Sequence, residues 1–357
     1  YMHQTITTVV GKKYTISATQ YHHATITVYL SVGTGAGVGN LLNIQYNSSS
    51  SDTPKELQGT FTATGTTTYI NLGVVTGTHN YSVGWDNIVV TESEQDRSVN
   101  GNGVQVFGTV TKSAVATGAD LVGYSGFSSS NYLEQPYNSD LNFGTGDFSV
   151  VGWINPTTST AHHGIVNRMD SGGGAGFLLE HRIGGTLLLQ TDDGTTVSNL
   201  FSTSARLGQW TQFCCTVTNS GTSLEWFMNG VSVAASTVTA RNVTNTAAVL
   251  RIGEKVTESR PMDGSFALIR ISATAPTAEQ IKKMYNDEKH LFQENAKATL
   301  YGTSDAVTAL AYDDATELLH VGTSAGRSVF QGLTRIDNTT DAVGAAISAS
   351  NGLVAED

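Results

Sequence analysis

The sequence predicts an all-β protein made of antiparallel sheets, and three observations support this fold class. Apolar and hydroxyl-bearing residues alternate along many short segments, and a period of two residues is typical of strands with one buried face. Charged residues make up only 14% of the chain, so uncharged polar residues must cover much of its surface. Helical spacing of apolar residues occurs in one segment, near 277–292.

Residues 1–92 read as short alternating strands separated by polar turns. In the segment 25–32 (TITVYLSV), Ile26 and Val28 begin a row of apolar side chains on one face, whereas Tyr29 belongs to the polar face. We therefore predict an antiparallel sandwich over this block. The polar, glycine-punctuated stretch 93–103 (SEQDRSVNGNG) is predicted to be a linker.

Residues 104–295 form a second predicted β block, which ends in a helix. Gly184-Gly185 and Asn229-Gly230 each separate two strand-like runs, which predicts a hairpin at both places. Thr277 precedes the helical pattern and Gln280 follows three residues later, and this spacing is the signature of a capping box.

One strand of this block has apolar residues on both faces. The segment 147–156 (DFSVVGWINP) places Phe148, Val150 and Ile154 on one face and Trp153 on the other. Because an indole ring is usually buried, we expect protein to cover Trp153. The alternative is a sugar stacked on the ring.

The only two cysteines, Cys214 and Cys215, are adjacent in a strand-like segment. Neighbouring residues of a strand point to opposite faces, so the pair is not expected to form an ordinary disulfide. We expect Cys215 in the core with Phe213 and Val217, and Cys214 on the other face.

Residues 296–357 begin with a predicted hairpin around 313–317 (DDATE) and continue as a tail rich in Ala, Ser and Gly. With so few large side chains, this segment cannot bury much of a core alone. We therefore expect it to assemble with other copies of the chain.

Charge and hydropathy argue against two classes of partner. The net charge of −11 argues against binding nucleic acid through its phosphates, which needs a basic face. No run of about 18 apolar residues is present, so membrane insertion is not expected. The sequence opens at Tyr1 in strand-like text, which predicts a piece of a longer protein.

The first block resembles the jelly-roll carbohydrate-binding modules over residues 3–92. The resemblance depends on the segments GKKYTISATQ, LQGTFTATGTTTYINLG and YSVGWDNIVVTE, although strands that usually precede the first of these are mostly missing. It implies calcium at Asp86, for which the alternative is a solvated or turn-capping carboxylate. Tyr29 and Tyr46, on or near the polar face, and Trp85 are candidate rings for stacking on glycans; the alternative is ordinary surface or buried aromatics.

The second block resembles the laminin-G-like, or concanavalin A-like, lectin sandwich over residues 104–290. Six segments occur in the family's order: NYLEQPYNSDLNFGTGDFSVVGWINP, LGQWTQFCCTVT, LEWFMNGVSV, RIGEK, MDGSFALIRIS and TAEQIKKMYNDE. Two positions depart from the family. Thr211 follows Trp210 where a His is frequent, and Ala267 stands where an Asp is frequent, which weakens a metal prediction taken from the family.

Lectins of this family often bind ligands and calcium at loop rims, which implies a site near the glycine loop 171–174 and the neighbouring hairpins. The alternative is a polar rim without a ligand. The candidate ligand-binding residues are His162, His163, Arg168, Asp170, His181, Arg182, Asp192 and Asp193.

The order of the two modules and the tail is similar to that of bacteriophage tail-fibre and receptor-binding proteins, which are usually homotrimers. The resemblance implies an extracellular, non-enzymatic protein of the virion tail. Its implied partners are a cell-surface glycan or another receptor, two further copies of itself, and other virion tail proteins.

Three alternatives stay open: a polysaccharide-degrading tail protein, an inert structural or decoration module, and a bacterial surface adhesin. Degradation requires a pair of carboxylates facing each other across a cleft. The nearest match in the sequence is Glu92, Glu94 and Asp96, which fall at the predicted linker, so we expect a solvated charge run there.

Overall fold

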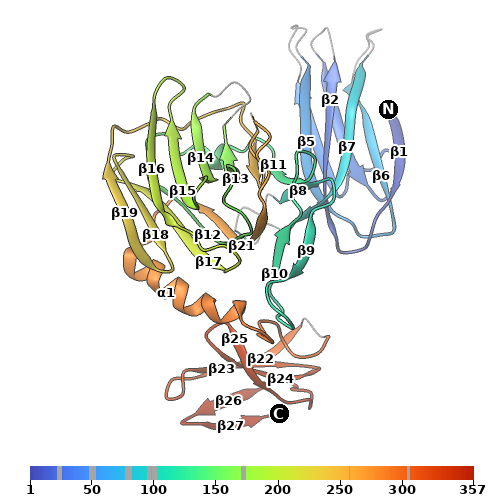
Figure 1. Cartoon of the computed structure of the whole chain (residues 1–357). Coiled ribbons are helices and arrows are strands. Elements are labelled where there is room, and N and C mark those ends of the chain that lie inside the picture. Colours follow the sequence, from blue (N-terminus) through green and yellow to red (C-terminus); the bar gives the residue numbers. More distant parts are fainter. Residues whose placement is uncertain are drawn as a thin grey trace. The chain divides into compact units, whose positions relative to one another are not determined.

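The structure is a computed structural model that describes residues 1–21, 26–47, 54–76, 83–94, 98, 103–169, 174–256, 258–303 and 306–357. Within these ranges the chain is built from antiparallel strands, and α1 (Ala278–Glu288) is the only α-helix (Figure 1). The predicted all-β fold is therefore confirmed. No helix in the same ranges has the length and apolar character needed to cross a membrane.

Contacts between residues divide the chain into two compact units. The first contains Tyr1–Thr109, Ser130–Tyr137 and Val249–Arg251, and the second contains Val110–Ser129, Asn138–Ala248 and Ile252–Asp357. The predicted domain boundaries at 92, 103 and 295 stay predictions. Of the predicted linker, 95–97 and 99–102 lie outside the described residues.

The first unit is a sandwich of two antiparallel sheets, with strand orders β1-β6-β3-β4 and β5-β2-β7-β8-β11. Its strands are β1 (Met2–Thr7), β2 (Lys13–Tyr21), β3 (Thr27–Gly33), β4 (Leu42–Asn47), β5 (Lys55–Thr62), β6 (Thr67–Thr76), β7 (Gly84–Glu94), β8 (Val104–Phe107) and β11 (Tyr132–Gln135). Val28 and Leu30 from β3 meet Ile16 from β2 and Phe61 from β5 in one buried core. The alternation of faces predicted for this strand is confirmed over its described residues, because the side chain of Tyr29 points away from that core.

The second unit contains a larger sandwich, whose sheets have the strand orders β19-β18-β17-β12-β21-β10-β9 and β16-β15-β14-β13. The elements of this part are β9 (Thr111–Ala114), β10 (Val122–Ser125), η1 (Ser139–Leu141), β12 (Phe148–Pro156), β13 (His163–Arg168), β14 (Gly176–His181), β15 (Thr186–Asp192), β16 (Val197–Ser204), β17 (Thr211–Thr218), β18 (Ser223–Met228), β19 (Val231–Thr237), β21 (Gly264–Ser272), α1 and η2 (Lys289–Phe292). The short strand β20 (Leu250–Ile252) is divided, with Leu250 and Arg251 in the first unit and Ile252 in the second. The hairpins predicted at Gly184-Gly185 and Asn229-Gly230 are both present, as β14–β15 and β18–β19.

The core between these two sheets combines aliphatic side chains with several buried aromatic rings. The ring of Phe148 lies 5.0 Å from that of Phe177, centroid to centroid, across the sandwich. Trp226 is fully buried and donates its indole N–H to the carbonyl of Leu200 at 3.0 Å. Cys215 is also fully buried, as predicted, and it is directly opposite Val150 in the β12–β17 ladder.

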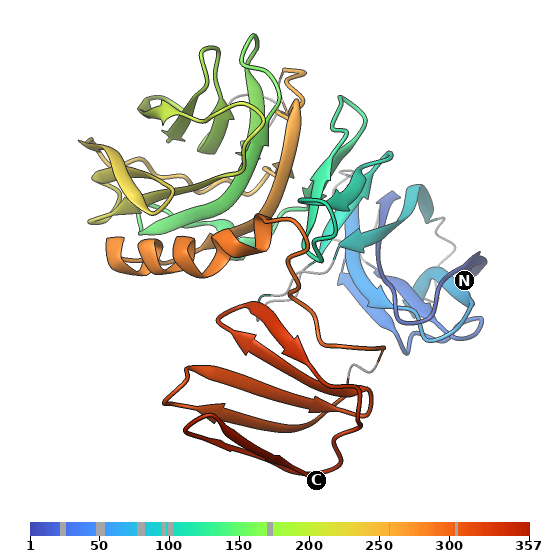
Figure 2. The same ribbon diagram turned by 60° about the horizontal axis from the view of Figure 1, so that its bottom comes forward.

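Helix α1 lies along the outer side of the seven-stranded sheet (Figure 2). Thr277 and Gln280 form the predicted capping box at its start. Beneath the helix, Ile281 packs against Cys214 and Val151, so the two cysteines point to opposite faces as expected. Both are free thiols.

Protein covers Trp153, as the sequence predicts. The side chain is 2% exposed, and its ring stacks on that of Phe292 with centroids 4.1 Å apart. Its indole N–H donates to the Glu288 carboxylate at 2.7 Å, and Arg270 donates two further hydrogen bonds to the same carboxylate, at 2.5 and 3.0 Å. These contacts fix the end of α1 on the sheet.

The C-terminal part of the second unit has a sheet of order β22-β23-β24-β25 and a separate hairpin of β26 and β27. The bounds are β22 (Val307–Asp313), β23 (Leu318–Thr323), β24 (Gly326–Gln331), β25 (Thr334–Asn338), β26 (Ile347–Ser350) and β27 (Leu353–Glu356). The hairpin predicted around 313–317 is confirmed. Asp313 joins the β22–β25 sheet to the β26–β27 hairpin, because its carboxylate accepts hydrogen bonds from the backbone N–H groups of Asn351 and Gly352 at 3.1 and 2.6 Å.

Candidate functional site

The strands β13 and β14 divide the candidate residues of the lectin-like block between their two ends. At one end His163 pairs with His181, and at the other Arg168 pairs with Phe177. His162, His163, His181 and Arg182 therefore gather at the first end, and Arg168, Asp192 and Asp193 at the second. Asp170 lies outside the described residues.

His163 begins β13 and His181 ends β14, and both side chains are buried. Their predicted place on an exposed loop rim was therefore wrong. His181 is fully buried, neither of its ring nitrogens has a hydrogen-bond partner, and its ring lies 5.8 Å from that of His163. Burial, helped by His163, lowers the pKa of His181 to about 4. The physical reason is strand parity: His181 lies on the same face as Leu179 and Phe177, which point into the core.

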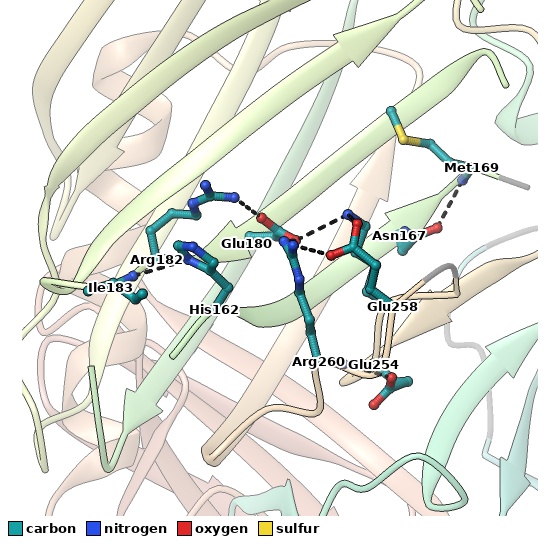
Figure 3. A network of polar contacts seen from close by, with 10 residues as sticks. His162, Asn167, Met169, Glu180, Arg182, Ile183, Glu254, Glu258 and Arg260 are labelled. Atoms are coloured by element: carbon teal, nitrogen blue, oxygen red, sulfur yellow. Dashed lines mark hydrogen bonds and ion pairs between the residues drawn. The ribbon is translucent and has the colours of Figure 1, made fainter. Parts of the chain in front are cut away.

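The outer face at this end is built around Glu180, whose side chain has no solvent exposure. Figure 3 shows its carboxylate accepting hydrogen bonds from Arg182 and from Arg260, the latter at 2.7 Å. Lys255 lies 3.7 Å away, and Glu258 forms an ion pair with Arg260. The loop carrying Lys255 and Arg260 thus closes over β14 through a set of ion pairs that we call the Glu180 network.

His162 joins this network at its edge. Its Nδ1 accepts the backbone N–H of Ile183 at 3.3 Å (Figure 3). Burial and the nearby Arg182 and Arg260 cations lower the pKa of His162. The ring is therefore uncharged at neutral pH and serves here as a hydrogen-bond acceptor.

The same outer face continues across β15 and β16, where the exposed side chains of Phe201 and Val197 lie beside amide side chains. Glu180 is opposite Leu188, which is opposite Phe201, and in the next row Gln190 is opposite Asn199. Phe201 is 49% exposed. The sequence did not predict this surface, because Val197 and Phe201 are exposed while Ser198 and Ser202 are buried, so residue type does not indicate the outer face here.

At the other end of β13 the candidate residues are engaged in holding turns. Arg168 is fully buried and donates to the Asn142 side chain at 3.2 Å and to the carbonyl of Asn245 at 3.0 Å, so it too is not a rim residue. Asp192 accepts the N–H of Gly194 at 2.8 Å. Hydrogen bonds from the Thr195 hydroxyl and from nearby backbone N–H groups hold the pKa of Asp193 well below its usual range.

In the first unit, Tyr29 lies on an aromatic face of the β1-β6-β3-β4 sheet. Its neighbours across the strands are Gly73 on β6 and Gln45 on β4. A Cβ atom at Gly73 would lie 2.8 Å from both Tyr29 and Tyr1, so these two side chains close over the glycine from two sides. Burial and the proximity of Tyr1 raise the pKa of Tyr29. We call the surface formed by Tyr1, Tyr29, Gln45 and Gly73 the Tyr29 face.

A glycine-rich loop borders the Tyr29 face. Asn71, which is fully buried, accepts the N–H of Gly37 at 2.7 Å and donates to the carbonyl of Val38 at 3.0 Å. One amide side chain thus holds the loop against the sheet. The contact requires a close backbone approach, because a Cβ atom at Gly33 would lie 2.0 Å from the Val38 oxygen.

The other candidates of the first unit lie elsewhere. Tyr46 and Trp85 are half-buried and pack against the hydrophobic core, so neither ring shares the Tyr29 face. Asp86 is exposed and accepts the N–H of Asn87 at 2.7 Å. Across the described residues, no group of three His, Cys, Asp or Glu side chains is placed to hold a metal ion, around Asp86 or anywhere else.

The carboxylates considered for catalysis are strand residues. Glu92 and Glu94 lie in β7, and Asp96 is outside the described residues. Glu92 forms an ion pair with Lys12 at 2.6 Å. The carboxylate of Glu180 is enclosed by cations, an arrangement suited to holding a loop in place rather than to attack on a glycosidic carbon.

A family model built from known proteins matches part of the second block. Residues 127–282 match the family model described as the concanavalin A-like lectin/glucanases superfamily. No curated protein matches the sequence.

Several solved structures are similar to the chain. The binding domain of Paraclostridial Mosquitocidal Protein 1 is 15% identical with a TM-score of 0.46, and the match covers 66% of this chain and 62% of that one. The botulinum neurotoxin serotype D binding domain is 14% identical with a TM-score of 0.45, and the match covers 70% of this chain and 60% of that one. The heptameric SAP-like pentraxin from Limulus polyphemus is 17% identical with a TM-score of 0.34, and the match covers 40% of this chain and 70% of that one.

None of these TM-scores reaches 0.5, so the assignment depends on the family match and on the two facing antiparallel sheets. The matched part of the chain has the concanavalin A-like, laminin-G-like fold, and we call it the lectin-like domain.

Proposed function

We propose that this protein attaches a virion to its host cell by binding surface carbohydrate, or another receptor, through its β-sandwiches without altering the ligand. One observation carries the proposal: each sandwich presents, on the outer face of a sheet, an aromatic ring beside amide side chains. In the first unit these are Tyr29 and Gln45, and in the lectin-like domain Phe201, Asn199 and Gln190.

This combination suits saccharides, because the C–H face of a sugar ring packs on an aromatic ring while amides exchange hydrogen bonds with its hydroxyls. Catalysis receives no comparable support. The buried carboxylate on the same face is Glu180, which is separated from Phe201 by Leu188 and is engaged with Arg182 and Arg260. Placement in a bacteriophage tail, in contact with other tail proteins, is part of the proposal and derives from the resemblance of module order.

Single sites of this kind bind weakly, and several linked copies raise the effective affinity. We propose that residues 296–357 join the chain into a homotrimer. Leu310, Tyr312 and Leu353 support this, because each is more than half exposed in that segment. Light scattering of the chain and of a 1–295 truncation tests it: the full chain should be trimeric and the truncation monomeric, and a trimeric truncation would refute it.

A glycan array tests the binding itself. We expect the full chain to bind a subset of glycans, and Tyr29→Ala together with Phe201→Ala to weaken that binding at least about tenfold. The matched controls are Tyr21→Ala and Leu207→Ala, because both side chains are also partly exposed but lie outside the two surfaces. Equal binding by all variants, or no binding by the wild-type chain, would contradict the proposal.

A further inference from the structure

A groove runs between helix α1 and the seven-stranded sheet, on the side of the lectin-like domain opposite the Glu180 network. Its volume is about 510 Å³. The helix supplies Gln280, Lys283, Met284 and Asp287, and the sheet supplies Ser149, Val151, Arg270 and Ser272. Figure 2 shows the helix lying along this sheet. The volume falls within the range of about 300–1,000 Å³ that is common for small-ligand sites.

Both walls of the groove are fixed before any ligand arrives. At one end of the helix, Glu288 receives hydrogen bonds from Trp153 and Arg270, and at the other the capping box holds its first turn. On the strand side, Ser149 donates to the carbonyl of Thr274 at 2.8 Å. A ligand therefore meets a formed site, which lowers the entropic cost of binding.

The charges that line the groove are already paired. Arg270 is held by Glu288, and Lys283 forms an ion pair with Asp287 at 2.8 Å. An anionic ligand would have to compete with these carboxylates, and a cationic ligand with the two basic side chains. The lining therefore favours a ligand without net charge.

The uncharged part of the lining offers apolar surface and hydrogen-bonding groups together. Val151, which is 5% exposed, and Met284 belong to the packed layer beneath the helix. Ser272 and Thr274 share one hydrogen bond at 3.0 Å, so one hydroxyl proton of the pair is left for a ligand. Gln280 uses its oxygen in the capping box, which leaves its amide N–H groups as donors.

We propose that this groove is a second saccharide subsite of the lectin-like domain, selective for neutral sugar residues. The inference rests on the proposed function, and it adds a site on the other sheet and a charge class for the ligand. The C–H groups of a sugar lie on Met284 and Pro276, and its hydroxyls exchange hydrogen bonds with Gln280, Ser272 and Thr274.

The test uses the full chain carrying Tyr29→Ala and Phe201→Ala, so that the two proposed faces are weakened, with neutral oligosaccharides of galactose, mannose or N-acetylglucosamine as the probes. Adding Ser272→Trp fills the groove and should reduce the remaining affinity at least about tenfold. The matched control is Ala273→Trp, because Ala273 is the next exposed residue and does not line the groove. Equal melting temperatures of the two tryptophan variants show that both are folded.

The charge class is tested in the same background. Affinity for the neutral probes should change less than about twofold between 50 and 500 mM salt, since no net charge is involved. Sialylated or uronic-acid oligosaccharides of equal length should bind more weakly. Equal binding by Ser272→Trp and Ala273→Trp, or a preference for the acidic probes, would overturn the inference. Loss of all glycan binding by the wild-type chain would instead overturn the proposed function.

Discussion

The buried ring of His181 predicts that the lectin-like domain loses stability in mild acid. His181 has a pKa of about 4 in the folded protein, against 6.5 for an unperturbed histidine. Between these two values the unfolded chain binds a proton that the folded protein does not, so unfolding becomes easier as the pH falls. The contribution is fully present above pH 6.5 and is lost progressively down to about pH 4.

The size of the effect follows from the shift. One pKa unit corresponds to about 1.4 kcal/mol, so the whole window is worth about 3 kcal/mol, and lowering the pH from 7 to 5 costs about 2 kcal/mol. These values are upper bounds, because a protonated ring can gain solvent by local opening. His162 and His320 also have lowered pKa values and contribute with the same sign.

The assay is urea unfolding followed by tryptophan fluorescence at pH 7 and at pH 5, for the wild type and for His181→Leu. Trp153, Trp210 and Trp226 belong to the second unit and report mainly on it. The variant should lose about 2 kcal/mol less between the two pH values than the wild type does. An identical pH dependence of the two proteins would refute the reasoning.

Three further predictions concern buried groups of the same domain. Glu288→Gln removes the charge that Arg270 requires and should lower the free energy of unfolding by about 1–3 kcal/mol. The control Asp287→Asn, in an exposed ion pair, should change the free energy of unfolding by less than about 0.5 kcal/mol in the same urea titration. Equal losses in the two variants would contradict this prediction. Glu180→Gln leaves Arg182 and its neighbours without their carboxylate and should cost about 3–5 kcal/mol, whereas a loss below about 1 kcal/mol would show that the network is dispensable. Burial raises the pKa of Cys214 to about 12, so its thiol should resist iodoacetamide at pH 8 in the native protein and react in urea. Mass spectrometry of the labelled peptides measures this difference. Rapid labelling of the native protein would be inconsistent with a helix that covers Cys214.

Much of the fold could be predicted from the sequence, because short-range sequence patterns determine it. Alternation predicted the strands, the Asn229-Gly230 pair predicted a hairpin, and Thr277 with Gln280 predicted the helix start. Each of these signals acts over a few residues, and no distant contact overrides it. The cover over Trp153 was predictable for a similar reason, since a ring of that size is rarely left in water.

The candidate site was less readable, because it depends on distant segments and on strand parity. Glu180 is separated by 80 residues from Arg260, its ion-pair partner, and nothing local in the sequence joins them. His181 was expected at a rim because lectins of the resembled family bind ligands at their loop rims, yet its parity on β14 directs it into the core. Tyr46 was grouped with Tyr29, but the register of β4 turns its ring toward the core of the first unit.

The central claim is that the chain holds a saccharide and leaves it intact. The most direct measurement exposes the full chain to purified host-surface polysaccharide, follows the bound mass by biolayer interferometry, and quantifies reducing ends in the same sample. We expect saturable binding with no increase in reducing ends. Release of reducing ends, or an absence of binding to every surface polysaccharide of the host, would contradict the claim.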